Sequence, residues 1–177
     1  MNRTLIVEQL PGLRRYARAL TGDAWAADDL VQDTLERACA KWQLWVTGSD
    51  LRAWLFTLMH NIYVNQRRAA KVALNSVNID DVEGDLQAPV SSSDDRLDLS
   101  RCLQRLPADQ RAVLLLVAVE DMSYEEAAKV LGIPMGTVMS RLSRARSRLR
   151  ELMEGAPAPA PAQRVPATSA PALRRLK

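Results

Sequence analysis

The amino-acid sequence predicts an all-α protein in which two small helical domains are joined by a flexible linker. Apolar residues recur at helical spacing through residues 1–75 and again through residues 99–154. No stretch of the chain sustains the alternation of apolar and polar residues that is typical of a half-buried strand. The 177 residues suffice for one or two domains, each with a modest hydrophobic core.

Two segments lack the helical pattern. Residues 76–98 are acidic and rich in Ser and Asp, a composition that is typical of a linker. Residues 155–177 hold five of the nine prolines and alternate Ala with Pro, which favours an extended chain without a core. We therefore expect a linker at the first segment and a disordered tail at the second.

Charge and composition exclude several classes of protein. The net charge is only +3, but basic and acidic residues are segregated, which is typical of proteins that bind polyanions. The two cysteines fit no metal-ligand spacing, and the only histidine, His60, has no triad or metal partner in sequence. The sequence therefore predicts no catalytic residue, no metal and no cofactor.

The chain also lacks the signature of a secreted or membrane protein. Its N-terminus has no long apolar stretch of the kind found in a signal peptide. The longest apolar run, residues 112–119, is too short to span a bilayer and suits a core helix. We expect a cytoplasmic protein with reduced, buried thiols and no membrane insertion.

Residues 26–42, "AADDLVQDTLERACAKW", predict a strong helix in the N-terminal domain. Its apolar side consists of Leu30, Val31, Leu35, Ala38, Cys39 and Trp42. Its N-terminal half carries four carboxylates, which favour the positive start of a helix dipole. These acidic residues either solvate the surface or dock a basic partner, and the sequence alone leaves both interpretations open.

Residues 51–71 form a second helix with an unusual polar surface. The side facing the core consists of Leu51, Trp54, Leu55, Leu58 and Ile62. One neighbouring stripe holds Asn61, Asn65 and Arg68, and the next holds Phe56, His60, Tyr63 and Arg67. Aromatic rings, amides and basic groups together suit unstacked single-stranded bases. In the alternative interpretation, Phe56 and Tyr63 belong to the core and Asn61 is an ordinary surface residue.

Residues 121–152 predict two helices joined by a tight corner. Ser123 and Glu126 form a capping-box pattern, Gly132 suits the end of a helix, and Pro134 suits the first turn of the next. An apolar stripe follows, made of Val138, Leu142, Ala145, Leu149 and Leu152. With the apolar segment 108–119 as its supporting helix, this is the pattern of a helix-turn-helix.

The second helix of this pair carries five arginines, and its exposed side suits the major groove of DNA. Arginine can bind guanine through two hydrogen bonds, and it can also contact phosphate. Two alternatives remain: a solvated basic face on an ordinary helical hairpin, and a coiled coil, for which the run is short.

Three stretches in this order resemble the extracytoplasmic-function sigma factors of bacterial RNA polymerase. "LPGLRRYARALTGDAWAADDLVQDTLERACAKW" resembles the polymerase-docking part of sigma region 2, and "LRAWLFTLMHNIYVNQRR" resembles the part that melts and reads the −10 element. "LPADQRAVLLLVAVEDMSYEEAAKVLGIPMGTVMSRLSRARSRL" resembles region 4, which reads the −35 element. The resemblance covers residues 7–72 and 99–152, and the linker 76–98 occupies the place of the larger sigma factors' region 3.

The resemblance implies a role for several residues. The polymerase β′ clamp would be met by Asp29, Leu30, Gln32, Asp33 and Arg37. The flipped −10 base would lie near Asn61 and Asn65, with the loop 43–50 completing its pocket and with Phe56, Tyr63, Arg67 and Arg68 beside it. The −35 element would be read by Ser140, Arg141, Ser143 and Arg144, with Arg148 on the same basic surface. Met139 stands where many family members carry Lys or Arg, so one basic contact is missing.

The resemblance also implies partners and a location. Core RNA polymerase would be bound through its β′ clamp and β flap, promoter DNA through both domains, and an anti-sigma factor would cover the same surfaces. Such a protein is cytoplasmic and associated with the nucleoid. A conventional regulator that binds duplex DNA without polymerase would explain residues 99–154 equally well, but it leaves the N-terminal domain unexplained. An enzyme acting on nucleic acid would need a nucleophile, metal or phosphate-binding motif that the sequence lacks.

Overall fold

The computed structural model describes residues 3–45, 50–76 and 94–154, and within these ranges the chain is helical without a strand. The prediction of an all-α protein is confirmed. The elements, in chain order, are α1 (Arg3–Thr21), α2 (Ala24–Ala40), the 3-10 turn η1 (Trp42–Leu44), α3 (Leu51–Ser76), α4 (Asp94–Gln104), α5 (Ala108–Ala118), α6 (Tyr124–Leu131) and α7 (Met135–Met153).

Local chemistry explains where α1 ends and α2 begins. Gly22 adopts a φ of +77°, a left-handed conformation that residues with a side chain rarely adopt, and so ends α1. The next residue, Asp23, caps α2 because its carboxylate accepts a hydrogen bond from the Ala26 amide at 2.7 Å. The two helices can therefore turn back on each other across a short connection.

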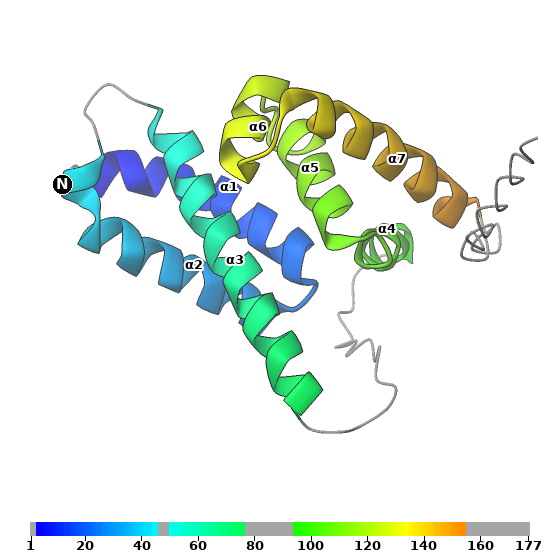
Figure 1. Cartoon of the computed structure of the whole chain (residues 1–177), viewed down its shortest axis with the longest axis horizontal. Helices are drawn as coiled ribbons and strands as arrows, with labels where there is room; N and C mark the ends of the chain where they lie inside the picture. The colour runs from blue at the N-terminus through cyan, green and yellow to red at the C-terminus, as the bar shows by residue number, and fades with distance from the viewer. Residues whose placement is uncertain (1–2, 46–49, 77–93, 155–177) are drawn as a thin grey trace, which may run out of the picture.

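The two helical blocks pack into one molecule with a continuous hydrophobic core. Helices α1, α2 and α3 form the N-terminal block, and α4 to α7 form the C-terminal block (Figure 1). Figure 1 also shows the two blocks side by side, with α5 in contact with α1 and α6 in contact with α3. One cluster of buried side chains includes Leu13 and Phe56 from the first block and Leu115 and Val130 from the second. The two segments that the sequence predicts to be separate domains are therefore packed against each other in this structure.

The boundaries of the predicted linker differ from those in the structure. Helix α3 continues to Ser76, and α4 already begins at Asp94, so residues 94–98 of the expected linker are helical. The rest of the linker and the Ala/Pro tail lie outside the described residues, so the expectation of flexibility there stays a prediction.

The two cysteines differ in their exposure, and only one of them is buried as the sequence predicts. Cys102 is buried as predicted, but Cys39 is exposed, because it lies at the edge of the apolar side of α2. Among the described residues, no helix combines the length and hydropathy needed to cross a membrane.

Candidate nucleic-acid and protein interfaces

The corner between α6 and α7 is built by local hydrogen bonds. The Ser123 hydroxyl accepts from the Glu126 amide at 3.2 Å, and the Glu126 carboxylate accepts from the Ser123 amide at 2.7 Å. These hydrogen bonds hold the pKa of Glu126 below its usual value. Gly132 ends α6 with a φ of +63°, and α7 begins directly after Pro134. The capping box and the glycine corner predicted from the sequence are both confirmed.

Helix α7 packs its apolar stripe on the C-terminal block and leaves a basic surface outside. Val138, Leu142 and Ala145 are buried, as the sequence predicted. The opposite side exposes Ser143 and Arg144. The resulting unit can present a helix with free arginine and hydroxyl groups to a groove of DNA.

Three other residues expected to read the −35 element are less available in this arrangement. Arg141 is half-buried and forms an ion pair with Asp109 on α5, with 3.2 Å between Nε and Oδ2. The Ser140 hydroxyl donates to the Thr137 carbonyl at 3.1 Å, a bond within α7 itself. Arg148 is also half-buried, and its Nε has no partner among the described residues.

The polar stripe of α3 is only partly as predicted. Four residues of the stripe are exposed while the two blocks are packed together, as expected for groups that contact nucleic acid: Asn61, Asn65, Arg67 and Arg68. Phe56 is fully buried, so in this arrangement its ring offers no face to a base. Its burial supports the alternative interpretation of the sequence, in which the aromatic residues belong to the core.

Tyr63 is the second aromatic residue that lies in the core, with 7% of its surface exposed. Its hydroxyl accepts from Nη2 of Arg111 at 3.2 Å and donates to the Leu20 carbonyl at 3.4 Å. Arg111 belongs to α5, so the C-terminal block covers the side of α3 that a helical projection places at the surface. Sequence periodicity cannot show this burial, because it arises from packing between distant segments.

A basic cavity lies where α3 meets the C-terminal block. Its lining includes His60, Arg67, Arg68 and Lys71 from α3, together with Asp109 from α5 and Arg141 from α7. The cavity thus places residues expected to read the −10 element beside one expected to read the −35 element. His60, to which the sequence assigned no chemistry, has an Nδ1 atom without a partner among the described residues. Burial, followed by repulsion from Arg141, lowers the pKa of His60 to about 4.

His60 should make the stability of the folded chain depend on pH. Its pKa is 6.5 in the unfolded chain and about 4 in the folded chain, so between these values only the unfolded chain binds the proton. Stability is therefore complete above pH 6.5 and falls as the pH falls toward 4. We expect the free energy of unfolding to drop by about 2 kcal/mol from pH 7.5 to pH 5 through this group.

Denaturant unfolding of the wild-type chain and of His60→Gln at both pH values measures this contribution. Carboxylates titrate equally in the two proteins, so the difference between them isolates the histidine. An equal loss of stability in both proteins would contradict the assignment.

The surface of α2 carries the residues expected to meet polymerase. Asp29, Gln32, Asp33 and Arg37 are exposed, whereas Leu30 is fully buried and belongs to the core. In this structure Leu30 therefore has no exposed surface with which it could contact polymerase. Its position on the apolar side of the helix explains the burial, because that side packs against α1 and α3.

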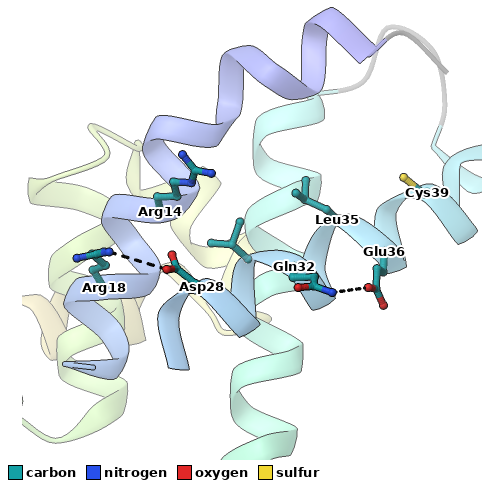
Figure 2. A pocket seen from close by; sticks show the side chains of 8 residues that line it. Arg14, Arg18, Asp28, Gln32, Leu35, Glu36 and Cys39 are labelled. Carbon is teal, nitrogen blue, oxygen red and sulfur yellow. Dashed lines mark hydrogen bonds and ion pairs between the residues drawn. The ribbon is translucent and has the colours of Figure 1, made fainter. Parts of the chain in front are cut away.

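A groove between α1 and α2 adds residues that the sequence did not single out (Figure 2). Arg14 and Arg18 of α1 line it together with Asp28, Gln32 and Glu36 of α2, and Arg18 points toward Asp28. Gln32 donates to the Glu36 carboxylate at 3.0 Å, and Arg18 lies 4.0 Å from Asp28. The floor includes Val31 and Leu35, so the groove combines an apolar base with charged rims of both signs. This composition is typical of a surface that binds another protein.

A buried carboxylate joins the two helical blocks, and no sequence pattern predicts it. Glu120, just after α5, has no exposed side-chain surface. Arg15 of α1 binds it through two parallel hydrogen bonds of 2.9 Å each. Arg52 of α3 lies 3.1 Å from its Oε2 atom and also donates to the Glu120 carbonyl. A single turn of the C-terminal block is thus held by arginines from two helices of the N-terminal block.

The described residues contain no cluster of His, Cys, Asp and Glu able to hold a metal ion. The features found are instead surfaces: a basic helix-turn-helix, an amide and arginine stripe on α3, and a charged groove beside α2. Their chemistry suits binding to nucleic acid and to protein.

Comparison with known proteins matches both blocks to parts of sigma factors. The family model "Sigma2 domain of PhyR" matches residues 6–60, and "Sigma-70, region 4" matches residues 96–149. The chain is 37% identical over 154 residues to the ECF RNA polymerase sigma factor EcfG of Rhodopseudomonas palustris, covering 84% of this chain and 82% of that protein. It is 40% identical over 156 residues to SigL of Mycobacterium tuberculosis, covering 84% and 86% of the two chains.

A solved structure of a sigma factor has the same fold. The sigma factor RpoE of Bartonella quintana, in complex with the anti-sigma factor NepR, superposes with a TM-score of 0.77 and 38% sequence identity. The match covers 86% of this chain and 96% of that one. Sequence and fold agree over most of the chain, and the chain therefore belongs to the ECF family of RNA polymerase sigma factors.

Proposed function

We propose that this chain binds core RNA polymerase, reads a −35 and a −10 element, and helps to melt the −10 DNA. The observation that supports this most directly is the presence of three different surfaces on one chain. The exposed face of α7 suits duplex DNA, the amide and arginine stripe of α3 suits melted DNA, and the surface of α2 suits a protein partner. A regulator that binds duplex DNA alone needs only the first.

Polymerase binding is proposed for the exposed side of α2 and the groove that adjoins it. Asp29, Gln32, Asp33 and Arg37 would contact the β′ clamp, with Glu36 bordering the same groove. Several charges on one rigid helix favour rapid and selective association with a partner of complementary charge. A second contact, between the C-terminal block and the β flap, completes this proposal.

Promoter reading is proposed for the exposed residues of α3 and α7. Ser143 and Arg144 would reach base edges at −35, where arginine can bind guanine through two hydrogen bonds. Asn61 and Asn65 would hold an unpaired −10 base through its edge, while Arg67 and Arg68 would hold phosphates. Unstacking costs a few kcal/mol per base, and these contacts would offset that cost.

The closed packing of the two blocks has to open before both elements can be read. Elements centred at −35 and −10 are separated by about 25 base pairs, or roughly 85 Å of duplex. In the closed molecule, His60 of α3 and Arg141 of α7 line the same cavity, so the two reading helices are neighbours. We infer that polymerase binding separates the two blocks.

An anti-sigma factor is proposed as a further partner. The similar RpoE of Bartonella quintana was solved together with the anti-sigma factor NepR. A protein that covers α2 or the reading faces of α3 and α7 would prevent assembly with polymerase. Such regulation fits a cytoplasmic protein that acts at the nucleoid.

A second candidate function is that of a decoy that binds an anti-sigma factor without starting transcription. The observation in its favour is the match of residues 6–60 to the family model "Sigma2 domain of PhyR". A decoy would bind the anti-sigma factor and would leave core polymerase without new transcripts.

Run-off transcription tests the proposed function. The purified full chain is added to sigma-free core polymerase and a pool of promoters from its own genome. Transcripts from a discrete set of promoters, absent without the chain, would support the sigma function. Specific binding of duplex DNA by the chain alone, without such transcripts, would instead favour a conventional regulator, and no activity in either assay would favour the decoy.

Replacing Asn61 by Ala should impair melting and spare polymerase binding. The exposed amide would lose its hydrogen bonds to the unpaired base, and loss of one such bond changes an equilibrium by up to about tenfold. Permanganate reactivity of the −10 thymines, measured at saturating polymerase, reports the fraction of open complex.

Gln66→Ala is the matched control, because Gln66 is also an exposed amide of α3 but donates to Asp33 on α2 at 2.9 Å. With this variant, the permanganate reactivity of the −10 thymines should equal that measured with the wild type. Undiminished reactivity in Asn61→Ala would remove this residue from the melting site.

A further inference from the structure

Two methionines stand exposed at the start of α7, on the side that faces away from the core. Met135 and Met139 each have 44% of their surface exposed. They are four residues apart, so they lie one above the other on one face of the helix. Their neighbours Val138 and Leu142 point into the core, so the exposure of the methionines does not arise from an unpacked helix.

The surroundings of these methionines also leave room for a partner. Gly136 lies between them, and a Cβ atom added there would meet nothing within 4 Å. Among the described residues, no contact requires a glycine at this position. Ser143 and Arg144 follow on the exposed surface one turn later. An apolar, closely approachable patch thus adjoins hydrogen-bonding and basic groups.

The chemistry of methionine restricts what this patch can read in DNA. In the major groove, the only apolar group on a base edge is the 5-methyl group of thymine. A thioether has no N–H or O–H to donate, and its flexible chain adapts to an apolar contact. The N-terminal half of the second helix in a helix-turn-helix is the part that reaches the base edges. The exposed arginines Arg144, Arg146 and Arg150 give α7 the charge needed to lie in that groove.

We propose that Met139, supported by Met135, reads the 5-methyl group of a thymine in the −35 element. This inference rests on the proposed sigma function. An apolar contact then sets the specificity of this chain at one position of the −35 element. A lysine or arginine at position 139 would instead favour guanine or phosphate.

Replacing single thymines by uracil tests the proposal, since deoxyuridine keeps the base pair and lacks only the methyl group. The full chain with core polymerase is bound to promoters carrying one such replacement at a time, on either strand of the −35 element. At one or two thymines we expect affinity to fall about 3- to 5-fold, the effect of losing one buried methyl group. Met139→Ala should bind the thymine promoter more weakly and should no longer distinguish thymine from uracil at that position.

Met153→Ala is the matched control, because Met153 is 61% exposed but lies at the far end of α7. It should distinguish thymine from uracil as the wild type does. The proposal is overturned if every thymine tolerates the replacement, if Met139→Ala keeps the distinction, or if the −35 element contains only G·C pairs. Each of these results leaves transcription from the unmodified promoter intact, whereas failure of the sigma function itself would abolish that transcription.

Discussion

Replacing Glu120 by Gln should loosen the packing between the two helical blocks by about 2–3 kcal/mol. Removing one partner of a buried ion pair typically costs about 3–5 kcal/mol, because the remaining charge is left uncompensated. Here the arginines are partly hydrated, with 53% of the Arg15 side chain and 38% of the Arg52 side chain exposed, which lowers the cost. The side chain of Glu120 itself is fully buried, so water cannot reach the position of the lost carboxylate.

The surroundings of Glu120 leave little room for another arrangement. A Cβ atom on Gly12 would lie 2.9 Å from the Glu120 Oε2 atom, so α1 approaches the carboxylate directly. Glutamine has nearly the same shape, but it presents an N–H donor to one of the two arginines. The substitution therefore removes the charge without creating a cavity, and its effect combines the loss of the ion pair with this unfavourable donor–donor contact.

Small-angle scattering and thermal unfolding of the free chain measure this change. We expect a larger radius of gyration in Glu120→Gln and two unfolding transitions in place of one. The matched control is Asp121→Asn, which neutralises the next carboxylate, an exposed one. Asp121 has a φ of +50°, and asparagine tolerates this left-handed conformation. A Glu120→Gln chain as compact and as stable as this control would show that the carboxylate does not hold the blocks together.

The ion pair also links stability to the proposed function. If both promoter elements are read only after the blocks separate, the closed packing reduces the fraction of chain that is competent to bind. Weakening the packing should then raise the apparent affinity for promoter DNA in the presence of polymerase. The same side chain would thus stabilise the free protein and limit its activity.

The helix-turn-helix could be predicted from sequence because its determinants are local. Ser123 and Glu126 are three residues apart, and Gly132 ends its helix by its own conformation. The apolar stripe of α7 likewise follows from spacing within one helix. Each of these features holds wherever the segment is placed, so no knowledge of the rest of the fold was needed.

The junction between the blocks could not be predicted, because its contacts join residues far apart in the chain. Glu120 lies 105 positions from Arg15 and 68 from Arg52. Phe56 and Tyr63 fall on a polar stripe of α3 by periodicity, and they are buried only because α1 and α5 pack over them. Periodicity identifies one buried side of such a helix and assigns the other to solvent. Only the tertiary structure shows that a second side also faces the core.

Replacing Arg144 by Ala should weaken promoter binding by about 1–3 kcal/mol and relax the choice of base at one −35 position. Arg144 is exposed on α7 and forms no ion pair with any described residue, so its guanidinium is available to a base edge. The loss of two hydrogen bonds to a guanine accounts for an effect of this size. The substitution should leave the fold intact, because arginine and alanine both favour a helix and no core contact is lost.

Competition binding of polymerase carrying the variant, on promoters with the native and a scrambled −35 element, separates base reading from phosphate binding. A base reader loses affinity only for the native element, so the difference between the two promoters should shrink. Arg150→Ala is the matched control, since it removes an equally exposed arginine from the last turn of the same helix. If Arg144→Ala weakens both promoters equally and reduces the salt dependence by about one unit of slope, the arginine binds phosphate, and base reading at −35 then depends on Ser143 and Met139.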